Sequence, residues 1–150
     1  MTNREVVTQF LTAYQRHDAP AMEARLDPRV EFADMAFPSI RADEVRAMWR
    51  WFCRSSEDRP QPVEVPGFDI VEESGDRVLA EYWVRYDVKG RRVNYVIRSE
   101  FTVRAGKIAR QVDRPTISKF EVARMATGFR LAALAMPWAM ARKLKAQPGN

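Results

Sequence analysis

An aspartate, Asp113, closes the last alternating segment of the chain, in the stretch "GKIARQVDRP" at residues 106–115. An apolar side chain is the ordinary choice at such a strand end, and Gln111, two residues earlier, falls on the same face as Asp113. A carboxyl group enclosed by apolar side chains favours its neutral form, so its pKa rises and it can transfer protons near neutral pH. The pattern equally allows a strand-end acid that caps the last helix or pairs with Arg110 or Arg114.

A second acid and several tyrosines are the other candidates for chemistry. Asp34 follows a short strand and allows two interpretations. It is either a base that takes a proton from a ligand carbon beside a carbonyl, or a loop acid that ends the strand. Tyr14 continues the apolar face of the first helix, and its hydroxyl is a potential donor. Tyr82 and Tyr86 share the apolar side of one strand, where a place in the core or in a pocket wall is the ordinary role.

Histidine and cysteine occur once each, as His17 and Cys53. His17 lies in a turn beside Asp18, which is typical of a helix cap, and Cys53 lies in an apolar stretch with no evident base. Single residues so far apart cannot form a transition-metal cluster, and no glycine-rich phosphate loop is present. We therefore expect no metal and no cofactor.

The composition predicts one globular domain in a reducing compartment. The chain has 150 residues, 46% hydrophobic and 30% charged, with a net charge of +5. A basic balance permits contact with nucleic acid, but acids are interleaved with the arginines, so a solvated mixed-charge surface is expected instead. One cysteine excludes an intrachain disulfide, and no secretory signal is evident, which together indicate a cytoplasmic protein.

The first part of the chain predicts three helices with one strand among them. Apolar residues recur at helical spacing over 3–16, a short helix follows Asp18, and a third helix covers 41–56. A strand is expected at 29–34. The apolar face of the third helix consists of Val45, Met48, Trp49 and Phe52.

The second half alternates with a period of two residues, which is typical of strands. Residues 78–88 and 92–103 are separated by a tight hairpin, and 107–113 return after the turn "RAG". This order predicts an α+β fold over residues 1–117, in which helices pack on one face of a strongly curved antiparallel sheet.

Residues 118–150 form a separate helical extension in this interpretation. Its apolar stretch "LAALAMPWAMA" has basic residues on both sides and is too short to span a bilayer. It can lie on a membrane surface, cover the mouth of a pocket or pack against a partner subunit.

Two stretches resemble the nuclear transport factor 2-like superfamily. "VEFADMAFPSIRADEVRAMW" is similar to its first strand, loop and third helix, and "EFTVRAGKIARQVD" to its penultimate hairpin. With the opening "VVTQFLTAYQRHD", the resemblance covers about residues 5–118 and is strongest to the SnoaL-like polyketide cyclase, ketosteroid isomerase and limonene epoxide hydrolase group. It implies a cone-shaped α+β barrel with a deep apolar pocket, and homodimers formed through the outer face of the sheet.

The resemblance also implies roles for single residues. In this group the acid at the position of Asp113 points into the pocket as acid or base, and Asp34 falls near the isomerase base. Three positions depart from the patterns: Gln111 stands where the cyclases often have histidine, Phe10 where the isomerases have tyrosine, and Tyr82 where the epoxide hydrolases have arginine.

These observations lead to two hypotheses of function. The first is an enzyme that performs cofactor-free isomerisation, cyclisation or dehydration on a small apolar molecule, with Asp113 and Asp34 as catalytic residues. The ligand contacts expected for it are Tyr14, Phe32, Trp49, Phe52, Tyr82 and Gln111. The second is a non-catalytic ligand-binding or assembly module, because this superfamily places many functions on one scaffold.

Overall fold

The computed structural model describes residues 1–35, 37–55, 60–88 and 90–116, so the predicted extension at 118–150 lies outside the described residues. Within these ranges the elements are α1 (Asn3–Gln15), α2 (Ala19–Glu23), β1 (Leu26–Ala33), β2 (Ile40–Arg41), α3 (Asp43–Phe52), β3 (Phe68–Ser74), β4 (Arg77–Val88), β5 (Arg91–Arg104) and β6 (Lys107–Pro115). No helix of the described segments has the length and apolar character that a bilayer crossing requires.

Helix α1 forms where the spacing predicted it and is closed at its start by a capping box. The Thr2 hydroxyl accepts from the Glu5 amide at 3.1 Å, and the Glu5 carboxylate accepts from the Thr2 amide at 2.6 Å. These two bonds satisfy amides that a helix start leaves unpaired. The inner face of the helix is fully buried and consists of Val6, Val7, Phe10, Leu11, Ala13 and Tyr14.

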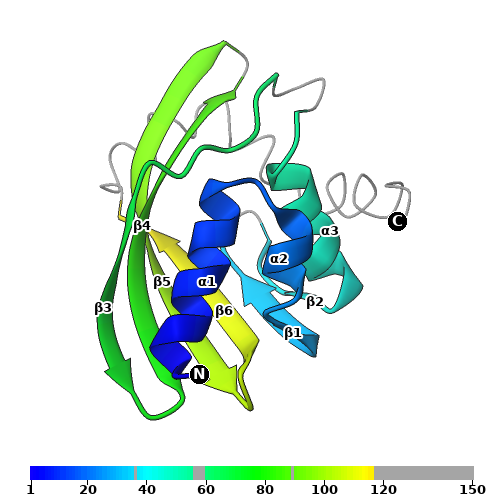
Figure 1. Cartoon of the computed structure of the whole chain (residues 1–150). Coiled ribbons are helices and arrows are strands. Elements are labelled where there is room, and N and C mark those ends of the chain that lie inside the picture. Colours follow the sequence, from blue (N-terminus) through cyan, green and yellow to red (C-terminus); the bar gives the residue numbers. More distant parts are fainter. Residues whose placement is uncertain (36, 56–59, 89, 117–150) are drawn as a thin grey trace.

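The strands form one curved sheet in the order β2-β1-β6-β5-β4-β3, counted over the described residues. Figure 1 shows α1 lying across the inner face of this sheet, with α2 and α3 beside it. The expected α+β architecture is confirmed. The sheet is mixed, however, because β1 runs parallel to β6, whereas every other neighbouring pair is antiparallel.

The boundaries of β1 and the presence of β2 differ from the sequence prediction. β1 begins at Leu26 rather than residue 29, so Pro28 lies inside the strand. A proline cannot donate to a ladder, and the pairing of β1 with β6 is irregular between Leu26 and Glu31, which accommodates it. The two residues of β2 lie in a segment predicted to be a loop, because so short a strand leaves no alternation to detect.

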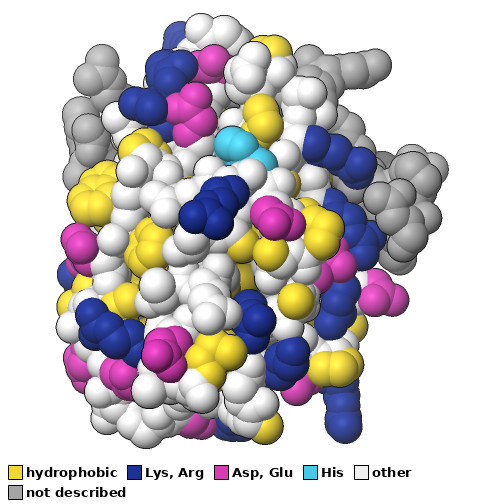
Figure 2. Space-filling view, viewed as in Figure 1, with side chains coloured by type: hydrophobic (Ala, Val, Ile, Leu, Met, Phe, Trp, Pro, Cys, Tyr) yellow, Lys and Arg dark blue, Asp and Glu magenta, His cyan; other side chains and the backbone are white. Residues whose placement is uncertain are grey.

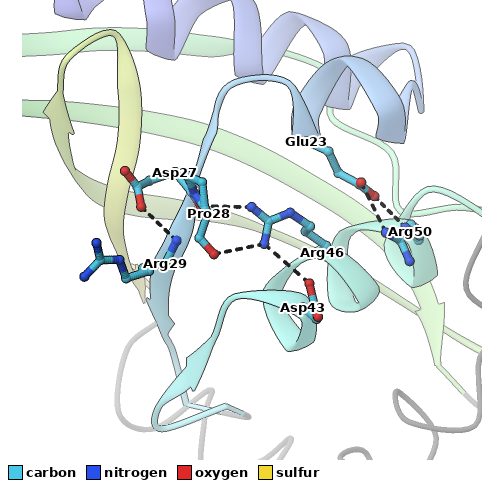
Figure 3. Close-up of polar contacts among 7 residues, drawn as sticks. All are labelled: Glu23, Asp27, Pro28, Arg29, Asp43, Arg46 and Arg50. Carbon is cyan, nitrogen blue, oxygen red and sulfur yellow. Dashed lines mark hydrogen bonds and ion pairs between the residues drawn. The ribbon is translucent and has the colours of Figure 1, made fainter.

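Helix α3 is held against α2 and the start of β1 by two arginines (Figure 3). Arg50 donates from Nε and Nη2 to the two carboxylate oxygens of Glu23, at 2.5 and 3.2 Å. Arg46 donates to the carbonyl oxygens of Asp27 and Pro28, at 3.0 and 3.4 Å. These contacts fix the position of the helix that carries Trp49.

A bulge in β6 sets which of its side chains face the helices. Val103 pairs with Ile108 and Thr102 with Arg110, so β6 has one extra residue between these pairs. The extra residue changes the phase of the alternation. Ile108 is buried before the bulge, and Gln111 is buried after it on the same inner face. The bulge thus orients both Gln111 and Asp113 inward.

The outer side of the sheet carries charged pairs. Arg98 of β5 lies 2.8 Å from Glu81, its register partner on β4, and Arg77 lies 3.1 Å from Glu100. Exposed pairs of this kind contribute little to stability, about 0–1 kcal/mol each. Figure 2 shows that acidic and basic side chains are interspersed on the face in view, which agrees with the mixed-charge surface expected from the sequence.

Candidate functional site

The Asp113 carboxyl group is 5% exposed and accepts hydrogen bonds from three side chains. Tyr82 donates its hydroxyl to Oδ2 of Asp113. Ser99 donates to Oδ1 at 2.5 Å, and Gln111 Nε2 donates to the same oxygen at 2.9 Å. Arg110, a partner considered from the sequence, instead approaches Glu31 at 3.9 Å. Asp113 is therefore the centre of an inward-facing polar network.

The register of the sheet explains how these groups meet. Ser99 is the direct partner of Asp113 across β5 and β6, and it is also the partner of Ala80 across β4 and β5. Neighbouring strands are about 4.8 Å apart, so β4 and β6 lie roughly 10 Å from each other. The small side chains of Ala80 and Ser99 leave room for the Tyr82 ring to cross that distance.

Two opposed effects act on the Asp113 carboxyl. Burial disfavours its charged form and raises its pKa above the ordinary value, whereas the bonds from Ser99, Tyr82 and Gln111 act in the opposite direction. Burial has the larger effect. Burial also raises the pKa of Tyr82 well above its ordinary value, and the neighbouring Asp113 raises it further. Tyr82 therefore keeps its proton at physiological pH.

A cluster of aromatic rings from the helices and from β1 meets this network at Tyr82. The Tyr14 ring lies 6.1 Å from the Tyr82 ring and 5.1 Å from Trp49. Phe32 meets Trp49 edge to face at 5.5 Å. Phe52 lies one ring further out, 5.8 Å from Trp49, and is only half-buried. Of the six predicted ligand contacts, Tyr82 and Gln111 thus bond to Asp113 directly. Tyr14, Trp49 and Phe32 belong to the ring cluster that meets Tyr82, and Phe52 is at its margin.

Two buried polar atoms of this cluster have no hydrogen-bond partner among the described residues. They are Nε1 of Trp49 and Oε1 of Gln111, and each of these residues is 1% exposed. One is a donor and the other an acceptor. Buried groups of this kind are uncommon in folded proteins and call for an explanation, such as a bound molecule.

All four tyrosines of the chain lie near one another. The Tyr86 and Tyr95 hydroxyls are 2.9 Å apart. Burial raises the pKa of Tyr95, and Tyr86, Tyr14 and Asp34 add to that effect. The tyrosine cluster therefore extends from Asp113 toward Asp34.

Asp34 has a local structural contact of its own. It closes the turn after β1, where its Oδ1 accepts from the Phe37 amide at 2.6 Å and its own amide donates to the Phe37 carbonyl oxygen at 2.8 Å. This is the arrangement of a loop acid, and a catalytic role for Asp34 stays a prediction.

Ser99 is the member of the network that sequence reasoning did not identify. It stands on β5 between Ile97 and Phe101, in the alternating row of side chains that also contains buried Phe101 and Val103. A hydroxyl residue in that row, opposite an acid on the next strand, was the available signal.

The single histidine and the single cysteine lie outside the network. His17 Nε2 contacts the Val63 carbonyl oxygen at 2.7 Å, which ties the end of α1 to the connector before β3. Cys53 Sγ lies 3.6 Å from the Met22 sulfur. Over residues 1–35, 37–55, 60–88 and 90–116, no three His, Cys, Asp or Glu side chains are grouped closely enough to hold a metal ion.

Helices packed inside a curved mixed sheet form the nuclear transport factor 2-like fold, also described as cystatin-like. The family model of the SnoaL-like domain matches residues 7–111, and the chain belongs to that family. The match ends two residues before Asp113, so membership alone does not assign a role to this carboxyl group. No curated protein sequence matches the chain.

Solved structures with this fold come from several bacteria. A candidate polyketide cyclase from Pseudomonas putida is 20% identical, covers 80% of this chain and 96% of its own, and has a TM-score of 0.65. An epoxide hydrolase from M. tuberculosis, similar to limonene epoxide hydrolase, is 22% identical, with coverages of 87% and 91% and a TM-score of 0.60. A Xanthomonas campestris protein of unknown function is 17% identical, with coverages of 81% and 95% and a TM-score of 0.68. At these identities the likeness concerns the fold.

Proposed function

We propose that this protein is an enzyme that moves a proton within a small apolar molecule, with Asp113 as the acid or base. The observation that supports this proposal is the Asp113 carboxyl group, which is buried and accepts hydrogen bonds from three side chains, one of them the hydroxyl of Tyr82. Burial raises the pKa of Asp113, which brings it closer to neutral pH and makes it a better proton acceptor than an exposed aspartate. No cofactor is needed for such a step.

The reaction class that suits these groups is isomerisation beside a carbonyl. Asp113 in its ionised form takes a proton from the carbon next to the carbonyl, and the electron pair of that C–H bond moves toward the carbonyl oxygen. Tyr82 retains its own proton and donates it to Oδ2 of the ionised Asp113. Once Asp113 has taken the substrate proton, its carboxyl group is a weaker acceptor, so the Tyr82 hydroxyl can turn from Oδ2 and donate to the oxygen on which negative charge has developed. Asp113 then returns the proton to another carbon of the same molecule. Cyclisation and dehydration begin with the same abstraction.

The relatives support this chemistry as far as fold permits. One is described as a candidate polyketide cyclase and another as an epoxide hydrolase, so proteins of this fold are named for reactions of oxygen-containing small molecules. Here Gln111 lies beside the acid on the same strand. A glutamine can orient a ligand but does not exchange protons. We therefore assign proton transfer to Asp113, with Asp34 as a second carboxylate.

The test combines a substrate panel with one nearly isosteric variant. Apolar enones, β-hydroxy ketones and epoxides are incubated with the protein in D₂O, and conversion or deuterium uptake is measured by mass spectrometry. We expect Asp113→Asn to lower turnover at least 100-fold, as loss of a general base does. Asp69→Asn, an exposed position on β3, is the matched control. Unchanged turnover in Asp113→Asn would remove this residue from the mechanism.

A second candidate is a ligand-binding or assembly module without catalysis. Both carboxyl oxygens of Asp113 are engaged by protein donors, which also suits a buried polar hub that only holds β4, β5 and β6 together. Binding of panel members without conversion, equally in the wild type and in Asp113→Asn, favours this candidate. The homodimer expected from the sequence remains a prediction for either function, and sedimentation tests it.

A further inference from the structure

Trp49 and Gln111 share aromatic neighbours although one belongs to a helix and the other to a strand. Phe32 of β1 and Phe101 of β5 are the register partners of Gln111 on either side of β6. Trp49 contacts the Phe32 ring at 5.5 Å, and it contacts the Phe10 ring, which itself meets Phe101, at 5.4 Å. Of the two phenylalanines that flank Gln111, Trp49 therefore contacts Phe32 directly and is linked to Phe101 through Phe10.

The orientation of the Gln111 amide follows from its neighbour. Its Nε2 donates to Asp113 Oδ1, which Ser99 also approaches as a donor. Oδ1 is therefore an acceptor, and turning the amide over would place oxygen against oxygen. This fixes Oε1 as the atom that faces away from Asp113, with acceptor capacity that no described residue uses.

A donor and an acceptor left together in an apolar shell have complementary requirements. A chemical group that satisfies both must accept from the indole N–H and donate to the amide oxygen. A hydroxyl group does both, whereas a ketone or an ether only accepts. An unpaired buried donor or acceptor destabilises the structure, so occupation by a group that pairs with both atoms is favourable.

We propose that Trp49 and Gln111 form a two-point recognition site for a hydroxyl group, so that ligands of this protein are apolar alcohols, phenols or enols. This inference rests on the proposed small-molecule function and specifies the class of its ligand. Gln111 bridges the hydroxyl site to Asp113, which places the recognised group beside the acid. A water molecule has the same donor and acceptor and is the other possible source of the hydroxyl.

The test compares three probes on the ¹⁵N-labelled protein: phenol, which donates and accepts, anisole, which only accepts, and toluene, which does neither. The indole N–H resonance of Trp49 is identified by its absence in Trp49→Phe. We expect phenol to shift this resonance and to bind roughly tenfold more tightly than toluene, with anisole between them, as one or two added hydrogen bonds imply. This comparison requires no variant, so it stands even if a variant folds poorly.

Two substitutions separate the partners. Gln111→Met keeps the approximate shape but removes the acceptor, so phenol should lose its advantage over anisole. Trp51→Phe, two residues from Trp49 in α3, should leave the phenol response unchanged. If the Trp49 indole proton is in contact with a water molecule that phenol does not displace, the hydroxyl site exists and water is its occupant.

The proposal is overturned by either of two results. One is an indole proton of Trp49 that phenol does not move and that has no contact with water, as when it faces an aromatic ring. The other is a phenol preference that persists in Gln111→Met. Asp113→Asn separates this inference from the function: it retains an acceptor for Gln111 Nε2, so phenol preference should persist while turnover falls. Turnover that persists instead rejects the catalytic role but leaves the hydroxyl site intact.

Discussion

The hydroxyl of Tyr82 on β4 reaches Oδ2 of Asp113 on β6, although strand β5 lies between them. Ser99 on that intervening strand donates to the other oxygen of the same carboxyl group. The acid is thus held by three consecutive strands rather than by its own strand alone. Its proton affinity depends on all of them, and each contact can be removed separately.

Tyr82→Phe removes one donor and keeps the ring. Since the Tyr82 bond lowers the pKa of Asp113, its loss should raise that pKa further above the ordinary value. We also expect a loss of about 1–2 kcal/mol in the free energy of unfolding at high pH. A ¹³C NMR titration of the Asp113 carboxyl carbon measures the pKa. Tyr86→Phe, which leaves the partners of Asp113 in place, is the control, and an unmoved Asp113 pKa in Tyr82→Phe would contradict the hydrogen bond.

The stability of the protein should depend on pH through Asp113. The folded state holds the Asp113 proton more tightly than the unfolded state, because burial raises the pKa from the value of 3.8 for a free side chain. The contribution of this group is therefore greatest at acid pH. It decreases as the pH rises from about 3.8 through the higher pKa of the folded protein, and then stays constant.

Asp113→Asn has no carboxyl group at this position and so lacks its pH-dependent contribution to the free energy of unfolding. The stability advantage of the wild type over this variant should therefore shrink as the pH rises. Urea unfolding at intervals between pH 4 and pH 8 measures the difference. A wild-type advantage that grows with pH across this interval would show a lowered, not raised, pKa for Asp113.

Ser99→Ala should destabilise the protein in a pH-dependent way. Ser99 donates at 2.5 Å and lowers the pKa of Asp113, which means that it binds the ionised carboxylate more strongly than the neutral acid. We expect a loss of about 1–3 kcal/mol that increases as the pH rises through the Asp113 pKa. Thr102→Ala, on the opposite side of β5, provides the comparison. A loss independent of pH would mean that Ser99 acts through packing only.

The Glu23–Arg50 pair should stabilise the position of α3. The two side chains are 22% and 29% exposed and bond through two atoms each, so we expect Arg50→Met to cost about 1 kcal/mol. A double-mutant cycle with Glu23→Gln isolates the pair, and its coupling energy should fall in high salt. The Trp49 indole resonance should move in Arg50→Met, because Trp49 lies one residue away in the same helix. A coupling energy of zero would mean that the Glu23–Arg50 pair does not contribute to the stability of the protein.

Much of the fold could be predicted because local patterns and tertiary structure agree. The apolar spacing of Phe10 and Tyr14 predicted α1, and the alternation from Val78 to Val84 predicted the inner face of β4. The parallel pairing of β1 with β6 could not be predicted from these patterns, because it joins segments about 80 residues apart and leaves no local signal. The bulge before Gln111 was equally invisible, since the side-chain pattern of β6 gives no evidence of an extra residue.

The candidate site could be predicted in part. Asp113 stood out because an acid occupies a position at the end of an alternating strand where an apolar residue is usual. The structure shows that Asp113 is buried. Its partners depend on distances across strands. That Tyr82 contacts a ligand stays a prediction, but its hydrogen bond to Asp113 across β5 was not foreseen. Ser99 was overlooked because a single small residue hardly interrupts an apolar row.

The carboxyl group and its three donors all belong to the continuous meander from Arg77 to Pro115, whereas the aromatic side chains packed around them come largely from α1, α3 and β1. Substitutions in the N-terminal half would therefore reshape the contour that a molecule meets, while the reactivity of the acid would stay under the control of the C-terminal strands. For the proposed enzyme, substrate choice and chemistry could then be varied independently, each through its own part of the gene.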